Sequence, residues 1–145
     1  MEYRIIDISM LNEMVQLFIE SFNCEPWLES WTEDTAAKRL ERSIKSETSY
    51  GICAYINDNL FGFILGNFEQ FCDRMEFVIQ ELAVRNSMRG QKIGSKLITE
   101  FEKRLRNKGV ENITLLTIKG NMTEHFYQKN GFNSKEKIVF MNKKL

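Results

Sequence analysis

The sequence predicts an α/β domain in which helices cover a mixed β-sheet. The chain has 145 residues, 43% of them apolar, which is enough to bury one substantial core. Segments with strand and helix periodicity follow one another in the order β-α-α-β-β-β-α-β-α-β. This order is not the βαβ repeat of a Rossmann domain, and the sequence has no G-x-G-x-x-G pattern. We expect one domain over residues 1–145, because no linker, internal repeat or low-complexity tract interrupts the chain.

The first half of the chain contains the predicted elements up to the first hairpin. Residues 3–7 are expected to form a strand, and apolar residues from Ser9 to residue 22 then recur at helical spacing, with Ser9 as the N-cap. Thr32, followed by two acidic residues, predicts a helix that runs to about Lys45. Strands are predicted over residues 49–56 and 60–68, because Asn57-Asp58-Asn59 between them has the composition of a hairpin turn.

The second half begins with a predicted strand over residues 75–84. A helix is expected from Gly90 or Gln91 to Asn107, with an apolar face and Gly109 just beyond its end. Residues 113–118 are predicted to form a central strand, residues 123–129 a short helix that ends near Gly131, and residues 137–143 a closing strand.

Composition narrows the classes of protein to which the chain can belong. No apolar run reaches 18 residues and the N-terminus lacks the layout of a secretory signal, so we expect a cytoplasmic protein without a membrane contact. Its three cysteines lie far apart in the sequence, which favours reduced thiols. It has one histidine and no cluster of metal-ligating residues, so no metal is expected.

The formal net charge of zero conceals an asymmetry between the two halves of the chain. Residues 1–81 contain 15 acidic and 6 basic side chains, a difference of −9, whereas residues 82–145 contain 5 acidic and 14 basic ones, a difference of +9. This split predicts a polyanion held by the second half and a cation attracted by the first, or two ordinary solvated faces. The basic half has no recognition helix or pattern of stacking aromatic residues, so nucleic acid is not expected as a partner.

Residues 81–97 form the most informative stretch of the chain. An apolar strand leads into a short basic turn that contains Gly90, and a helix begins directly after it. This arrangement gathers free backbone N–H groups, the positive end of a helix and cationic side chains around a volume that suits a pyrophosphate. A second stretch, residues 126–132, adds the phenol of Tyr127.

These two stretches together resemble the conserved motif regions of the GNAT superfamily of acetyl-CoA-dependent N-acetyltransferases. In the pattern Gln/Arg-x-x-Gly-x-Gly/Ala, Arg89 and Gly94 match the first and last positions, while Lys92 replaces the middle glycine. The resemblance covers essentially the whole chain and is strongest over residues 78–132. It implies a mixed, mostly antiparallel sheet of about six to seven strands, flanked by four helices, in which the fourth and fifth strands splay apart.

The resemblance also implies acetyl-CoA as the cosubstrate. Its pantetheine arm would lie between the splayed strands against the backbone of Leu82 and Val84, and a strand N–H at Leu82 would polarise the thioester carbonyl. Amides from Arg89 to Ser95 would bind the pyrophosphate. The predicted cofactor contacts are Leu82, Ala83, Val84, Arg89, Gly90, Gln91, Lys92, Ile93, Gly94, Ser95, Asn121, Phe126 and Lys129.

Two residues are predicted to carry the chemistry. Tyr127 resembles the general acid of the family, because a phenol with a pKa of about 10 keeps its proton until a thiolate forms; it could instead be a core aromatic. Glu81 is the candidate general base, with Glu69 and Glu76 as rivals, since a bulge in its strand would alter which face it occupies. His125 is interpreted as structural.

The resemblance implies that the loop over residues 23–31 forms one wall of the acceptor pocket. Glu25, Trp27, Trp31 and also Glu69 are the predicted substrate-binding residues, although the tryptophans could equally pin the loop to the core. We expect direct acetyl transfer to a primary amine of a small molecule, aminoglycoside- or polyamine-like. Alternatives are a non-catalytic acyl-CoA-binding or sensing module and a protein N-terminal or lysine acetyltransferase. A homodimer formed through edge strands or terminal segments is also expected.

Overall fold

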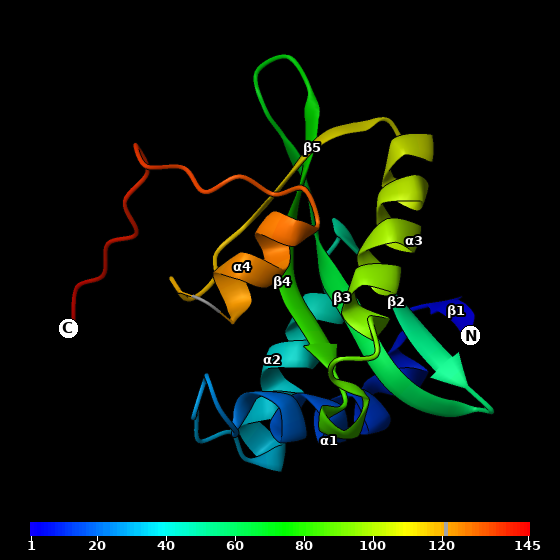
Figure 1. Cartoon of the computed structure of the whole chain (residues 1–145). Coiled ribbons are helices and arrows are strands. Elements are labelled where there is room, and N and C mark those ends of the chain that lie inside the picture. The colour runs from blue at the N-terminus through cyan, green and yellow to red at the C-terminus, as the bar shows by residue number, and fades with distance from the viewer. Residues whose placement is uncertain (121) are drawn as a thin grey trace.

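The computed structural model describes residues 1–120 and 122–145 as a sheet with helices on both faces (Figure 1). Its strands are hydrogen-bonded in the order β1-β2-β3-β4-β5, antiparallel except for β5, which runs parallel to β4. The α/β fold with a mixed sheet is thus confirmed, with five strands rather than six to seven. The strands are β1 (Glu2–Ile5), β2 (Ser49–Ile56), β3 (Asn59–Gln70), β4 (Met75–Val84) and β5 (Val110–Leu115).

The predicted closing strand over residues 137–143 is wrong. These residues have no regular secondary structure, and the chain beyond α4 runs away from the sheet to the C-terminus (Figure 1). The apolar side chains from Ile138 to Met141 are 69–83% exposed. Apolar, β-branched residues favour a strand only where a neighbouring strand and a packed face stabilise it, and this segment has neither in the described part of the chain.

The helices α1 (Leu11–Phe22) and α2 (Glu33–Lys45) pack on one face of the sheet, and α3 (Ile93–Asn107) and α4 (Thr123–Lys129) pack on the other. Two 3-10 turns precede helices, η1 (Ile8–Met10) before α1 and η2 (Asn86–Met88) before α3. The sheet therefore separates two apolar cores. Each core contains phenylalanines, such as Phe18 and Phe63 on one side and Phe77 and Phe101 on the other.

Two predicted helix caps have different outcomes. Thr32 caps α2 as expected, because its hydroxyl accepts from the Thr35 N–H at 3.1 Å and the Thr35 hydroxyl accepts from the Thr32 N–H at 3.0 Å. Ser9 is not an N-cap: the Asp7 carboxylate accepts from the Ser9 N–H at 2.8 Å and caps η1. The extra 3-10 turn moves the cap toward the N-terminus, where the longer acidic side chain is available.

A β-bulge in β4 decides the direction of Glu81. Leu65 of β3 lies opposite Glu81, but the next residue, Gly66, lies opposite Ile79, so Gln80 is an extra residue in β4. Phe77 and Ile79 face α3, and unbroken alternation would place Glu81 on that same face. The extra residue reverses the alternation and turns Glu81 toward α2.

The outer edge of β4 is only partly covered. Its pairing with β5 runs from Met75 opposite Val110 to Ile79 opposite Leu115, where β5 ends. Residues 80–84 continue β4 alone on that side within the described residues. The predicted splaying of the fourth and fifth strands is therefore present, and it leaves an open strand edge next to Glu81.

Candidate active site

The turn between β4 and α3 is anchored to α1 through Glu20. The Glu20 carboxylate accepts from the Arg85 guanidinium at 3.0 Å and from the Asn86 backbone N–H at 2.8 Å. The Asn86 side-chain amide also donates to the Glu20 carbonyl oxygen at 3.1 Å. These bonds hold the turn in place before any ligand binds, which lowers the entropic cost of ordering a binding loop.

Arg89 and Gln91, two of the predicted cofactor contacts, form hydrogen bonds within the protein. The Arg89 guanidinium donates to the carbonyl oxygens of Ser21 and Glu25, both at 3.1 Å, so it holds the loop that follows α1. The Arg89 N–H donates to Asn86 and the Gln91 N–H donates to Met88, so both amides are used within the turn itself. Among the described residues, the amides that remain free to face a phosphate are therefore those of the later residues of the predicted pyrophosphate contacts, Ile93, Gly94 and Ser95.

Those amides lie at the first turn of α3. The N–H groups of Ile93, Gly94 and Ser95 have no acceptor within the helix, and Lys92, at the N-cap, provides no side-chain cap. Lys92 has a φ of 63° and Gly90 a φ of 81°, so both adopt the left-handed conformation. The family pattern has a glycine where Lys92 stands, and this backbone explains why, since a side chain there costs on the order of 1 kcal/mol.

Gly94, in the first turn of α3, packs against α4, the helix that carries Tyr127. A Cβ atom at Gly94 would lie 2.9 Å from the Phe126 ring, so a larger residue there would force this ring to move. Phe126, predicted to contact the cofactor, packs against Gly94 and Tyr127. Lys129 is exposed in the last turn of α4, and His125 is exposed on the same helix.

Tyr127 projects from α4 into an aromatic surrounding. Its ring centroid lies 5.1 Å from that of Phe126 and 5.6 Å from that of Phe132, both edge-on. Burial, and after it the negative charge of Glu81, raises the pKa of Tyr127 to about 12. The phenol is therefore protonated at neutral pH, as a general acid must be, and it lies within electrostatic range of Glu81.

Glu81 is buried on the α2 face of the sheet, with 5% of its surface exposed. Its carboxylate accepts from Arg39 Nε at 2.5 Å. Burial is the largest influence on this carboxyl group and raises its pKa, whereas the bond and the charge of Arg39 act in the opposite direction. A carboxylate with a raised pKa beside a cleft is a recurrent arrangement for a general base.

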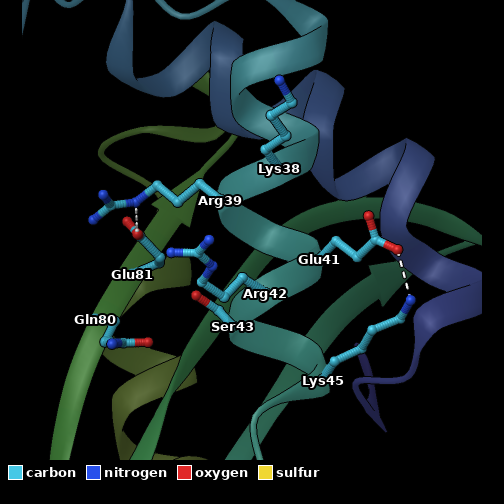
Figure 2. Close-up of a pocket in the computed structure, with 8 residues that line it drawn as sticks. All are labelled: Lys38, Arg39, Glu41, Arg42, Ser43, Lys45, Gln80 and Glu81. Atoms are coloured by element: carbon cyan, nitrogen blue, oxygen red, sulfur yellow. Dashed lines mark hydrogen bonds and ion pairs between the residues drawn. The ribbon is translucent and has the colours of Figure 1, made fainter.

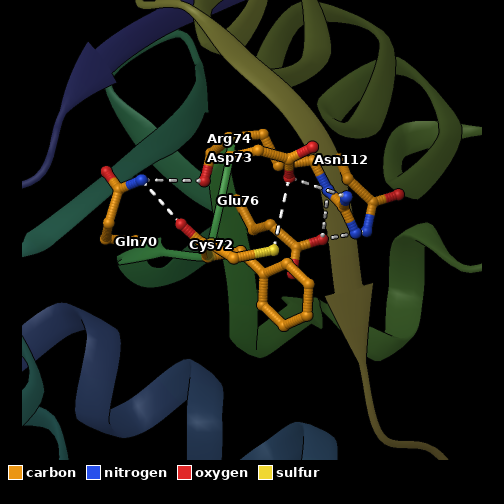
Figure 3. Close-up of polar contacts among 7 residues, drawn as sticks. Gln70, Cys72, Asp73, Arg74, Glu76 and Asn112 are labelled. Atoms are coloured by element: carbon orange, nitrogen blue, oxygen red, sulfur yellow. Dashed lines mark hydrogen bonds and ion pairs between the residues drawn. The ribbon is translucent and has the colours of Figure 1, made fainter.

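The two rival carboxylates lie elsewhere. Glu76 is buried near the start of β4, where it accepts from Arg74 Nε at 3.4 Å and from the Asn112 amide and so ties β4 to β5 (Figure 3). It lies five residues from Glu81, which is roughly 16 Å along a strand. Glu69 is exposed near the end of β3. Of these three carboxylates, Glu81 is the one whose charge raises the pKa of Tyr127.

The loop over residues 23–31 is held to the core by its two tryptophans. Trp27 packs edge-on against Phe22 at 5.4 Å between ring centroids, and Trp31 packs likewise against Phe18 at 4.9 Å. The Trp31 ring also lies 5.4 Å from the Arg39 guanidinium. Of the predicted acceptor residues, Trp31 is therefore linked to Glu81 through Arg39, while Glu25 is exposed. Asn121 lies outside the described residues.

An open cavity of about 850 Å³ lies between α2 and β4 on the Glu81 side (Figure 2). Apart from Glu81, its lining was not predicted from the sequence, although four of the six basic residues in the acidic half fall between residues 38 and 45. Arg39 and Arg42 both extend from α2 toward β4 (Figure 2). The lining consists of Lys38, Arg39, Glu41, Arg42, Ser43, Lys45, Gln80 and Glu81.

Two further observations concern residues 1–120 and 122–145 only. No group of three metal-ligating side chains converges there, and no helix there has the length and apolar character needed to cross a membrane.

Comparison with known proteins places the chain in a family. The model of the acetyltransferase (GNAT) family matches residues 11–132. A search of curated proteins gives no match. An aminoglycoside acetyltransferase from an uncultured soil metagenomic sample, solved with sisomicin, superimposes with a TM-score of 0.79 at 19% identity, covering 99% of this chain and 95% of that one.

Two further solved structures share the fold. The aminoglycoside 6′-N-acetyltransferase AAC(6′)-IG from Acinetobacter haemolyticus has a TM-score of 0.77 at 14% identity, with 100% and 99% coverage. AAC(6′)-Iy, bound to an analogue that joins CoA to acetylneamine, has a TM-score of 0.76 at 17% identity, with 99% and 98% coverage. With the family match over residues 11–132, the chain belongs to the GNAT family of acetyl-CoA-dependent N-acetyltransferases.

Proposed function

We propose that this protein transfers the acetyl group of acetyl-CoA directly to a primary amine of a small molecule. The observation that carries the proposal is the pairing of Glu81 and Tyr127 beside the open edge of β4. One residue can accept a proton and the other can donate one, and the charge of Glu81 raises the pKa of Tyr127. The acceptor cavity adjoins Glu81.

The opposite side of this edge suits acetyl-CoA. The uncapped first turn of α3, with Ile93, Gly94 and Ser95, would bind the diphosphate through backbone N–H groups. The pantetheine arm would lie along residues 82–84, where β4 lacks a β5 partner. Thr117, two residues beyond β5, has a buried hydroxyl with no hydrogen-bond partner among the described residues, which supports a polar ligand in this gap.

The transfer would proceed with a simple exchange of bonds. Glu81, directly or through water, takes a proton from the ammonium or the attacking amine, because only a neutral nitrogen is a nucleophile. The nitrogen forms a bond to the thioester carbon while a strand N–H, at Leu82, stabilises the carbonyl oxygen. The carbon–sulfur bond then breaks, and Tyr127 donates its proton to the departing thiolate. The phenolate regains a proton from the new amide nitrogen or, through water, from Glu81.

We further propose that the protein acts in the cytoplasm, on a small molecule and not on nucleic acid. Aminoglycosides are the first acceptors to assay, because the names of the solved structures refer to them, and polyamines are the second. The side chains around the cavity carry an excess of positive charge, which favours an acceptor other than these polycations.

We also propose that the protein forms a homodimer. The exposed apolar segment over residues 138–141 and the unpaired outer edge of β5 are both surfaces that a second copy of the chain could cover. Sedimentation equilibrium of the full chain is expected to give twice the mass of one chain, and a monomer at micromolar concentration would exclude the dimer.

The proposed base is tested by a Glu81→Gln variant and its pH profile. The carboxyl group can accept a proton only when ionised, and burial raises its pKa above the ordinary value of 4.5. We therefore expect kcat/KM of the wild type to fall as the pH decreases through this raised pKa. In the variant, kcat should drop by about 10- to 100-fold and the acidic limb should disappear, as measured by thiol release.

Glu76→Gln is the matched control, because Glu76 is also a buried glutamate of β4 that pairs with an arginine. It should leave the pH profile unchanged. If both variants keep the acidic limb, Glu81 is not the base. If the protein binds acetyl-CoA but acetylates no amine in a broad panel, it is a sensing module rather than an enzyme.

A further inference from the structure

The cavity between α2 and β4 carries an excess of positive charge, although it lies in the acidic half of the chain. Four of its eight lining residues are basic and two are acidic. Three of the four cations have a carboxylate partner: Lys38 pairs with Asp34, Arg39 with Glu81 and Lys45 with Glu41. Among the described residues, no carboxylate lies within ion-pair distance of Arg42.

Arg42 is also the cation that extends toward the proposed site of reaction. It lies three residues after Arg39, so both occupy one face of α2, and both extend toward Gln80 and Glu81 of β4 (Figure 2). Glu41 and Lys45 lie on the other side of the helix in the same view. The charge of Glu81 is already balanced by Arg39, so Arg42 supplies a net positive charge beside it.

Two neutral donors adjoin Arg42 in the cavity. Ser43 provides a hydroxyl. The side-chain oxygen of Gln80 accepts from the Asn67 amide at 3.0 Å, which leaves the Gln80 NH₂ group available to donate. A guanidinium, a hydroxyl and an amide NH₂ together form a donor set for a carboxylate or phosphate oxygen.

We propose that the acceptor is an amine that also carries an oxyanion, a carboxylate or a phosphate, and that Arg42 binds this group while the amine faces Glu81. This inference rests on the proposed acetyl transfer and names its substrate class. A polycationic acceptor such as an aminoglycoside would instead meet Arg42, unpaired among the described residues, as a like charge, which disfavours its binding. The formal charge of residues 1–81 is thus a poor guide to the acceptor.

The test compares amines that differ only in the oxyanion. Lysine is paired with cadaverine, its decarboxylated form, and phosphoethanolamine with ethanolamine; an aminoglycoside, kanamycin, is included. With acetyl-CoA, the wild type is expected to give a kcat/KM at least tenfold higher for one or both oxyanion members than for their partners. Preference for lysine alone indicates a carboxylate, and preference for phosphoethanolamine alone a phosphate. The proposal would be overturned if cadaverine and ethanolamine were both turned over as fast as or faster than their oxyanion partners, or if kanamycin were turned over as fast as or faster than the preferred oxyanion member.

The Arg42→Gln variant should lower kcat/KM for the preferred oxyanion member by about tenfold or more, and that of its partner by less than threefold. Lys38→Gln is the matched control, because Lys38 is on the same helix, lines the same cavity and already has a carboxylate partner. It should leave the preference intact. An equal effect of both substitutions would assign the preference to general charge and not to Arg42.

Titration of the same amines against the CoA-bound protein separates this proposal from the proposed function. Tighter binding of the oxyanion member that is lost in Arg42→Gln, without any acetylated product, would support the cavity assignment and reject acetyl transfer. Turnover without discrimination between the paired amines would support acetyl transfer and reject the cavity assignment.

Discussion

Replacing Tyr127 with phenylalanine is expected to lower kcat by about 1000-fold while leaving the affinity for acetyl-CoA unchanged. The substitution removes the hydroxyl but keeps the ring, so the edge-on contacts with Phe126 and Phe132 remain. Without a proton donor, the thiolate must leave unprotonated or take a proton from water, and general acids typically contribute 100- to 10,000-fold. Steady-state release of CoA, together with calorimetric titration of acetyl-CoA, measures both quantities.

The pH dependence of the wild type adds a second expectation for the same residue. Because burial and Glu81 raise the pKa of Tyr127 to about 12, its phenol should remain protonated through pH 10, with no loss of activity there from this group. Tyr50→Phe is the matched control, since Tyr50 is a partly buried tyrosine stacked on Phe101 on the same side of the sheet. If Tyr127→Phe and Tyr50→Phe have the same kcat, Tyr127 is not the acid.

Replacing Gly66 with alanine is expected to reduce the free energy of unfolding by about 3 kcal/mol or more. A Cβ atom at this position would lie 2.0 Å from the Val78 carbonyl oxygen and 2.7 Å from the Phe77 ring. The clash is with the backbone of the paired strand, so it can be relieved only by moving β3 and β4 apart, which is costlier than ordinary overpacking. Urea denaturation followed by circular dichroism measures the change.

The same substitution should affect the site, because Gly66 lies beside the bulge that turns Glu81 toward α2. Surviving folded protein is therefore expected to lose activity as well. Glu69→Ala, an exposed position of the same strand, should change the free energy of unfolding by less than about 0.5 kcal/mol. Stability of Gly66→Ala within 1 kcal/mol of the wild type would show that the strands adjust and that the bulge is not rigid.

Much of the architecture follows from local sequence signals. The hairpin composition at Asn57-Asp58 corresponds to two residues of positive φ between β2 and β3, as a tight turn requires. The Thr32 cap and the bounds of β4 and α4 also match the prediction, because propensity, capping and periodicity agree there. Residues 138–141 have equally strong strand propensity, yet they form none, since strands depend on partners that a local pattern does not reveal.

The candidate site was only partly accessible from sequence. Tyr127 and the turn before α3 were predicted from motifs, whereas the direction of Glu81 depends on a register shift that periodicity cannot reveal. Arg89 matches the motif but bonds to the end of α1 and to the loop after it, long-range contacts with no local signal. Arg39 and Arg42 belong to no sequence motif, and only the packing of α2 beside β4 brings them to the cavity.

The central claim is that backbone N–H groups at the start of α3 bind the diphosphate of coenzyme A. Calorimetric titration of the full chain with CoA and, in parallel, with pantetheine, which lacks the diphosphate and the nucleotide, tests it most directly. The account predicts a clear binding isotherm for CoA and at least 100-fold weaker binding of pantetheine, because the α3 amides and the dipole of that helix act only on the charged group. Equal affinities for the two ligands, or no heat with CoA at millimolar concentration, would contradict it.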